Sequence, residues 1–334
     1  MAKSILAIFC IYLLLASCYY AKASETDVGT TGGSVTKISI GARAAGMGNA
    51  FVGVADGVNC VYWNPAGLGI IERTQFSATH TEWLADTRYE WAGLAQSFTK
   101  WVTIGMDAAI FYTGQIPRTI ESSVGDYEED GVFEYNNTNF RLAIGSGAYR
   151  KVRIGASFQV FQQEVDYERI VKQQVPDRKA RSTFANLGIL YQPTDKLRIG
   201  VSIQNIGNGI KGLGEKNEQL PRIIRLGVAY TTRVVREELP IEQETQKQSG
   251  NKLIIAGDVV KPSDRSIGIN AGLEYTFQNG FVLRGGYQSN TDFDLLSSLR
   301  GGFGYVTPTY RIDYAFVPYG DIGNTHRVTF TLSF

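Results

Sequence analysis

The last nine residues of the chain read His326-Arg-Val-Thr-Phe-Thr-Leu-Ser-Phe334. Apolar side chains alternate with polar ones in this stretch, the apolar set being Val328, Phe330, Leu332 and Phe334. A period of two residues places the two kinds of side chain on opposite faces of a β-strand. We therefore predict a terminal strand with one apolar face and one polar face.

The same alternation recurs from Gln75 onward and predicts about fourteen strands. Between Ile267 and Phe277, for example, every second residue is apolar and the residues between are small or polar. An apolar face and a polar face on each strand fit a membrane barrel, with lipid outside and a hydrated lumen inside. The expected strands are 74–83, 87–100, 102–113, 138–150, 152–163, 182–192, 197–206, 222–235, 252–260, 266–277, 281–289, 299–306, 309–317 and 326–334.

The links between these strands alternate in length. Short links are expected at 100–101, 151, 193–196, 278–280 and 307–308. Longer links are expected at 114–137, 164–181, 207–221, 290–298 and 318–325. Outer-membrane barrels have short periplasmic turns and longer outer loops, whereas a soluble β-sandwich, the alternative, has no reason to alternate them. We predict an all-β fold, an antiparallel transmembrane β-barrel of about 14 strands over 73–334, with 236–251 as an exception on the short-turn side.

Composition agrees with a barrel and excludes other classes of protein. The 334 residues carry 33 Lys plus Arg, 32 Asp plus Glu and a net charge of +1, so we expect no nucleic-acid partner. Gly is abundant at 37 residues and Pro scarce at 9, as suits closely packed, bending strands. Beyond residue 23 there is no apolar run long enough for a membrane-spanning helix.

The N-terminus, 1–23, reads as a signal peptide. Lys3 precedes an apolar run, and Ala21-Lys22-Ala23 forms a small-x-small cleavage site before Ser24. The alternative is lipidation at Cys18, which follows Leu15-Ala16-Ser17. Both interpretations predict export from the cytoplasm.

Residues 24–72 differ from the rest and are predicted to form a plug, or hatch, inside the lumen. The stretch 41–56 is small and Gly-rich, with a short helix expected near 44–56, and 61–69 contains Asn64-Pro65, which favours a turn. Small residues suit a segment that must pack closely against a wall. The residues singled out here are Gly41, Arg43, Gly46, Gly48, Asp56, Trp63, Asn64, Pro65 and Gly67.

Two motifs give this segment a resemblance to a known family. Gly41-Ala-Arg-Ala-Ala-Gly-Met-Gly48, followed by Tyr62-Trp-Asn-Pro-Ala-Gly-Leu68, resembles the N-terminal hatch of FadL-like outer-membrane proteins, and within them the PorV/PorQ family. The stretch 310–327 is also similar to that family. The resemblance implies a fourteen-stranded barrel with an internal plug in the outer membrane of a Gram-negative-type bacterium. The last nine residues themselves resemble the closing strand of a bacterial outer-membrane β-barrel, whose final Phe is typically part of the assembly signal, so Phe330 and Phe334 are expected to belong to that signal.

Two roles follow from the resemblance. PorV-type proteins act in type IX secretion, so the main expectation is an accessory that holds exported cargo at the cell surface. FadL-type proteins pass hydrophobic small molecules inward, and this is the alternative. The partners implied are outer-membrane lipid, the barrel assembly machinery, and either secreted cargo with secretion-system components or a hydrophobic small molecule.

Residues typical of an enzyme site are not grouped in any recognisable motif, so we predict no catalytic, cofactor or metal site and no enzymatic activity. One polar pattern remains. Four arginines with lumen-facing parity lie near the starts of strands that follow short turns, and we expect them to form a basic collar at the periplasmic mouth: Arg153, Arg198, Arg284 and Arg311. Buried charges require partners. Those partners are either wall acids, Glu274 and Asp313, or the plug, through Asp56 or main-chain carbonyls.

Overall fold

The computed structural model describes residues 31–121, 125–168, 178–211, 217–234, 250–289 and 295–334. The predicted signal peptide and most of the segment 236–251 lie outside these residues. The strands of the wall have the following bounds: β1 Gln75–Glu82, β2 Arg88–Thr99, β3 Val102–Tyr112, β5 Tyr127–Ser146, β6 Val152–Glu168, β7 Arg178–Thr194, β8 Leu197–Gly207, β11 Ile223–Val234, β12 Asn251–Pro262, β13 Gly268–Thr276, β14 Phe281–Gln288, β15 Leu299–Val306, β16 Tyr310–Pro318 and β17 Asn324–Ser333.

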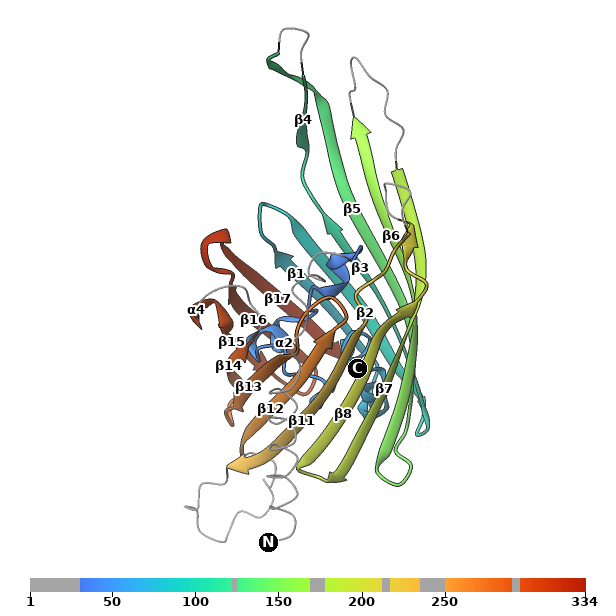
Figure 1. Ribbon diagram of the computed structural model, residues 1–334. Helices are drawn as coiled ribbons and strands as arrows, with labels where there is room; N and C mark the ends of the chain where they lie inside the picture. Colours follow the sequence, from blue (N-terminus) through green and yellow to red (C-terminus); the bar gives the residue numbers. More distant parts are fainter. Residues whose placement is uncertain (1–30, 122–124, 169–177, 212–216, 235–249, 290–294) are drawn as a thin grey trace, which may run out of the picture.

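These strands form a closed antiparallel barrel (Figure 1). The main sheet has 15 strands, but β4 (Ile116–Glu121) is attached to β5 alone, which leaves fourteen in the wall. Two pairings close the ring, since β17 pairs with β1 from Ser333↔Gln75 to His326↔Glu82, and β3 pairs with β5. The prediction of an antiparallel 14-strand barrel is confirmed. Within the described residues, the helices are all too short or too polar to cross a bilayer.

The two faces of the wall differ in polarity as the alternation predicts. On β13, Asn270 and Glu274 are buried on the lumen side, whereas Leu273 is 51% exposed on the outer side. Outward-facing apolar side chains can be exposed in this way without penalty only where the surrounding solvent is lipid. The wall is therefore built to stand in a bilayer and to hold a polar interior.

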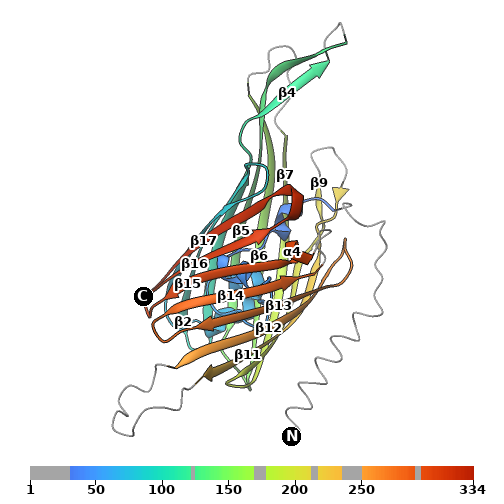
Figure 2. The same cartoon turned by 90° about the vertical axis from the view of Figure 1, so that its left-hand side faces the viewer.

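The wall is taller on one side than the sequence predicts. The range 114–137, expected as a loop, contains β4 and the first half of β5, and β6 and β7 also extend beyond their expected ends. Figures 1 and 2 show these strands rising above the rest of the barrel. Cross-strand pairs continue through the extension, for example between the rings of Phe133 and Tyr167, whose centroids are 6.0 Å apart. Acidic residues interrupt the alternation of apolar and polar side chains in this range, so the sequence did not indicate strands there.

The N-terminal segment lies inside the barrel (Figure 2). It contains η2 (Ser34–Lys37), α2 (Ala42–Gly46), α3 (Cys60–Trp63) and η3 (Pro65–Ile70). α2 contacts β14, β15, β16 and β17, whereas η3 contacts β3, β5, β6 and β7, so the segment bridges opposite sides of the wall. We call residues 32–71 the plug. Its first helix is shorter than predicted, because Gly48 and Asn49 both adopt left-handed conformations with φ of 63°.

The closing strand supports a first prediction. The amide of Phe334 donates to Thr74 O at 2.9 Å, which extends the β17–β1 pairing by one bond, while the Phe334 ring is exposed. Deleting Phe334 should lower the yield of assembled barrel, because lipid does not tolerate an open strand edge and the predicted assembly signal is lost. The measurement is the fraction of protein that migrates faster on gels when unheated. Phe303→Ala, which removes an exposed ring from β15, is the control and should assemble normally. Equal yields would contradict the prediction.

Candidate functional site

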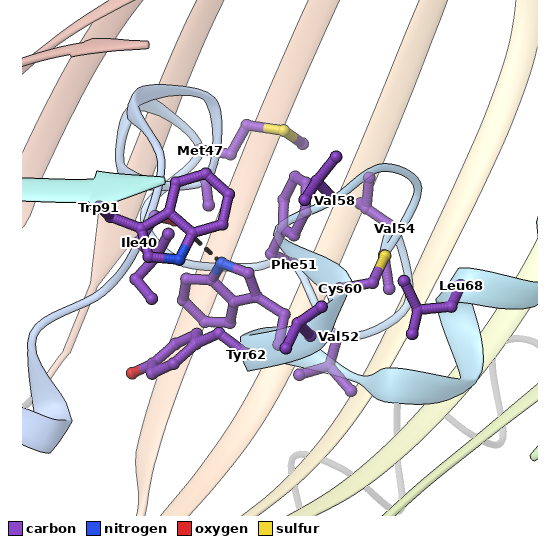
Figure 3. Close-up of a cluster of buried hydrophobic side chains, with 14 of the residues drawn as sticks. Ile40, Met47, Phe51, Val52, Val54, Val58, Cys60, Tyr62, Leu68 and Trp91 are labelled. Carbon is purple, nitrogen blue, oxygen red and sulfur yellow. Dashed lines mark hydrogen bonds between the residues drawn. The ribbon is translucent and has the colours of Figure 1, made fainter. Parts of the chain in front are cut away.

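The centre of the plug is an apolar cluster around three aromatic residues, Phe51, Tyr62 and Trp63 (Figure 3). The Trp63 ring lies 5.8 Å from that of Phe51 and 5.1 Å from that of Tyr62, and its Nε1 donates to Ile40 O at 3.0 Å. Cys60 lies in the same cluster with no exposed surface. Burial raises the pKa of the Cys60 thiol, so this cysteine is unreactive while the plug is in place.

Asn64 and Pro65 form the turn that the sequence predicts. Asn64 Oδ1 accepts from the Ala66 amide at 3.2 Å, and Pro65 begins η3 at its first position, where no amide hydrogen is needed. The Asn64 amide group also donates to Ile189 O of β7 at 3.1 Å. The turn is therefore a point of attachment between plug and wall.

Wall side chains satisfy other main-chain groups of the plug. Asp258 of β12 accepts from the amides of Phe51 and Val52 at 2.8 and 3.0 Å. Thr329 of β17 accepts from the amide of Ala42 at 2.8 Å. A buried main-chain group without a partner would cost free energy comparable to a lost hydrogen bond, so these polar wall residues allow an irregular segment to be buried.

The plug glycines that were singled out differ in their surroundings. A Cβ added at Gly46 would approach Gly302 of β15 at 3.3 Å, and one at Gly48 would meet Tyr287 O of β14 at 2.5 Å. A Cβ at Gly41 would instead approach Asn59 of the plug at 3.0 Å, and one at Gly67 would meet Ala55 O, also of the plug. Gly46 and Gly48 therefore lie against the wall, while Gly41 and Gly67 allow the plug to pack on itself.

The wall carries a second set of glycines that sequence reasoning missed. An added Cβ at Gly155 would lie 2.3 Å from Pro65 C, and one at Gly188 would lie 2.0 Å from Asn64 Oδ1. Cβ atoms do not approach other atoms this closely, so the plug rests directly on wall backbone. The wall glycines at which an added Cβ would come within about 3 Å of the plug are Gly93, Gly105, Gly145, Gly155, Gly188, Gly200, Gly227, Gly272 and Gly286. The alternation within each strand already places these glycines on the lumen-facing side, so the sequence contained a signal for them.

The four arginines of the predicted collar divide into two pairs. Arg153 Nε donates to Gly69 O at 3.2 Å and Arg198 Nη1 donates to Val54 O at 2.6 Å, so these two contact plug carbonyls. Arg284 and Arg311 bind wall acids instead. The sequence left open whether the partners are plug groups or wall acids. Plug carbonyls are the partners of Arg153 and Arg198, and wall acids are the partners of Arg284 and Arg311.

The acids around Arg284 and Arg311 join the wall to the plug. Glu274 accepts from Arg284 at 2.7 Å, from Arg311 at 3.1 Å and from Arg43 of the plug at 2.7 Å. Asp313 accepts from Arg284 at 2.7 Å and from Arg311 at 2.8 Å. Glu274 is 2% exposed. One buried carboxylate thus holds three guanidinium groups, one of which belongs to the plug.

Within the plug, Arg43 also forms an ion pair with Asp56. Burial alone would raise the pKa of Asp56, but the charges of Arg43 and Arg198 lower it below its ordinary value. Both partners are therefore charged at neutral pH. The sequence singled out Arg43 and Asp56 without predicting that they pair with each other.

On the side of the plug toward the longer loops lies a cavity of about 300 Å³, which we call the outer cavity. Its lining includes the rings of Trp63, Trp83 and Tyr319, and the centroids of the last two are 5.3 Å apart. Trp63 belongs to the plug, so the plug forms part of the cavity wall. On the other side of the plug are two open hollows of about 600 and 610 Å³, the first lined by the collar residue Arg311 and the second by Arg153 and Arg198.

Apolar side chains of β6 and β7 lie on both faces of the wall. Phe161 is fully buried and packs with Phe184, Ile210 and Leu220. Leu187, in contrast, is 48% exposed on the outer face of β7. The aromatic residues of the outer cavity were missed, because Trp83 and Tyr319 lie in links between strands, where a period of two gives no signal.

Solved structures with the same fold include three bacterial barrels. The Ralstonia pickettii toluene transporter TbuX has a TM-score of 0.53 at 14% identity, over 88% of this chain and 97% of that chain. The Pseudomonas putida toluene transporter TodX has a TM-score of 0.53 at 13% identity, over 88% and 97%. The CymD monoaromatic hydrocarbon channel has a TM-score of 0.54 at 14% identity, over 89% and 98%. These likenesses show a fold shared with FadL-like barrels.

The comparisons do not support the narrower resemblance to PorV/PorQ, which stays a prediction. A search of curated proteins found no match. A family model described as "Uncharacterised protein family (UPF0164)" matches residues 20–232, which is more than half of the chain. The protein therefore belongs to the Uncharacterised protein family (UPF0164).

Proposed function

We propose that this protein is a non-enzymatic channel of the bacterial outer membrane that takes up small hydrophobic molecules. The observation that carries the proposal is the outer cavity, a space of about 300 Å³ with three aromatic rings between the plug and the wall. Concave sites with apolar walls and a few polar groups are typical of small-molecule binding. The similar barrels include a toluene transporter and a monoaromatic hydrocarbon channel, whose substrates agree with a cavity of this size.

In this proposal a molecule enters from the side of the longer loops and binds in the outer cavity, and it passes inward when the plug moves. Trp63 couples the two events, since it lines the cavity and also occupies the centre of the plug cluster. The proposal places the chain in the outer membrane, with lipid around the wall and the barrel assembly machinery as an expected partner.

The other expectation, an accessory that holds secreted cargo together with secretion-system components, stays a prediction. Its structural support within the described residues is the tall extension formed by β4, β5, β6 and β7, which offers a surface above the barrel. The outer cavity gives uptake the stronger support, because a cavity of about 300 Å³ is of a size for a small molecule and not for a protein cargo.

Filling the outer cavity should stop uptake. Val260 lines the cavity, whereas its neighbour Val259 has the opposite parity and faces outward on the same strand. Val260→Trp should reduce uptake of radiolabelled toluene to the level of cells without the protein, because the added indole occupies the binding space. Val259→Trp adds the same group on the lipid side and should leave uptake unchanged. The measurement is the initial uptake rate in a Gram-negative host that lacks its own barrels of this fold. Equal uptake by the parent and Val260→Trp would refute the role of the cavity.

A further inference from the structure

The outer cavity has an excess of positive charge. Lys37, Arg225 and Arg265 line it, and none of its lining residues is acidic. Lys37 is neutralised by Asp264 at 2.6 Å, just outside the lining. Arg225, however, hydrogen-bonds the neutral side chain of Gln204 and lies over the Trp63 ring at 5.2 Å. A cavity that served only neutral hydrocarbons would not need this charge.

Two further arginines lie behind the cavity surface, on either side of β16. Arg327 of β17 pairs with Ala315, and Arg300 of β15 precedes Gly301, which pairs with Phe316. Their exposures are 0% and 6%. The buried β16 side chains beside them, Ala315 and Val317, are apolar. The side chains of the neighbouring strand that lie beside both guanidinium groups are therefore apolar, and the buried acid of that strand, Asp313, is bound by Arg284 and Arg311 instead.

Much of the hydrogen-bonding capacity of these two arginines is unused. Arg327 Nη1 donates to Ser39 O at 2.7 Å and to Ser39 Oγ at 2.6 Å. Within the described residues, Nε and Nη2 of Arg327 and Nε and Nη1 of Arg300 have no hydrogen-bond partner. The arginines on the opposite side of the plug differ, since Arg284 and Arg311 are each bound by two carboxylates.

Arg327 and Arg300 lie behind residues that line the outer cavity. Arg327 lies over the Trp83 ring at 5.4 Å and is bonded to Ser39, and both Trp83 and Ser39 line the cavity. Tyr319, which also lines it, forms a side-chain hydrogen bond and an electrostatic interaction with both Arg300 and Arg327. Three of the residues that separate solvent from these arginines are therefore the same residues that a bound molecule would touch.

A buried charge is costly unless it is paired and hydrogen-bonded. A carboxylate satisfies that need best, because it accepts two parallel bonds from a guanidinium group. We propose that the outer cavity binds a small aromatic carboxylate, with its charged group at Arg327 and Arg300 and its ring among Trp63, Trp83 and Tyr319. The volume of about 300 Å³ limits the ligand to a molecule with one or two rings. The inference rests on the proposed function for its biological meaning, and it names the class of molecule taken up.

The test compares benzoate with benzamide, a neutral molecule of nearly the same shape. Binding is measured by quenching of tryptophan fluorescence and by titration calorimetry on the purified, heat-modifiable protein. Benzoate should bind the parent protein at least about tenfold more tightly than benzamide, because charge-assisted hydrogen bonds to a buried partner are worth roughly that factor or more. Equal binding of the two ligands would overturn the inference.

Variants locate the site. Arg327→Gln and Arg300→Gln should each weaken benzoate binding much more than benzamide binding and so remove most of the preference for benzoate, whereas Arg327→Lys should retain part of the preference. Arg118→Gln is the matched control, since Arg118 pairs with Asp130 on the extension, away from the cavity. A preference for benzoate that survives both glutamine substitutions would place the anion elsewhere and refute the assignment.

Failure of this inference can be told from failure of the proposed function. Toluene uptake that depends on Val260, without a preference for benzoate, would leave the channel proposal standing and end the carboxylate proposal. Preferential benzoate binding without uptake of toluene or benzoate would support the carboxylate proposal and end the channel proposal. The outer cavity would then be a binding site in a protein that does not transport.

Discussion

Replacing Glu274 with glutamine should loosen the plug while the barrel stays assembled. Glu274 accepts hydrogen bonds from Arg43 of the plug and from Arg284 and Arg311 of the wall. Removing one partner from a buried charge network costs about 3–5 kcal/mol, because the remaining charges are left uncompensated. Most of this cost should fall on plug opening, since Arg43 is the residue that can leave the site.

The measurement is the labelling rate of Cys60 by a soluble thiol reagent, with the labelled peptide identified by mass spectrometry. Cys60 has no exposed surface in the structure, so it reacts only when the plug opens. If most of the 3–5 kcal/mol is lost from the free energy that holds the plug in place, Cys60 should be labelled faster by on the order of 10²- to 10³-fold. Glu90→Gln is the control, because its partner His80 is half-exposed and the pair contributes little. Parental labelling in a heat-modifiable Glu274→Gln protein would mean that packing alone holds the plug.

The barrel could be predicted from the sequence because its physical cause is local. Each strand separates lipid from lumen, so apolar and polar side chains must alternate, as they do on β13 between Asn270 and Leu273. The extension could not be predicted in the same way. Above the bilayer both faces of β5 meet water, and residues such as Glu128 and Glu134 then interrupt the alternation without ending the strand.

The contacts of the plug were only partly predictable. The sequence indicated that lumen-facing arginines need partners, but the choice between wall and plug depends on where an irregular segment lies in three dimensions. Arg198 reaches Val54 O and Arg284 reaches Glu274, although both have the same parity on their strands. The outer cavity was missed for a related reason, because its rings come from links and from the plug rather than from one periodic stretch.

The wall glycines lead to the last prediction. Gly155 of β6 lies under the Asn64-Pro65 turn, and an added Cβ would be 2.3 Å from Pro65 C and 2.4 Å from Ala66 N. These are main-chain atoms held by η3, so they cannot move aside as a flexible side chain could. Gly155→Leu should therefore prevent the plug from seating, and overpacking at such a site costs about 1–3 kcal/mol or more.

Ala156→Leu is a matched control for this substitution. Ala156 is the next residue on β6 and has the opposite parity, with Ile144 and Leu187 as its cross-strand partners on the outer face. A leucine there projects into lipid and should leave both plug and barrel unchanged.

In Gly155→Leu, Cys60 should be labelled at nearly the rate of the unfolded protein while the barrel remains heat-modifiable, because the strand pairing of β6 does not depend on the plug. If Gly155→Leu instead fails to assemble and Ala156→Leu assembles normally, the wall cannot form without a seated plug. The wall glycines would then be needed for assembly of the barrel as well as for seating of the plug. Parental labelling of Cys60 in an assembled Gly155→Leu barrel would show that the plug does not rest on this part of the wall.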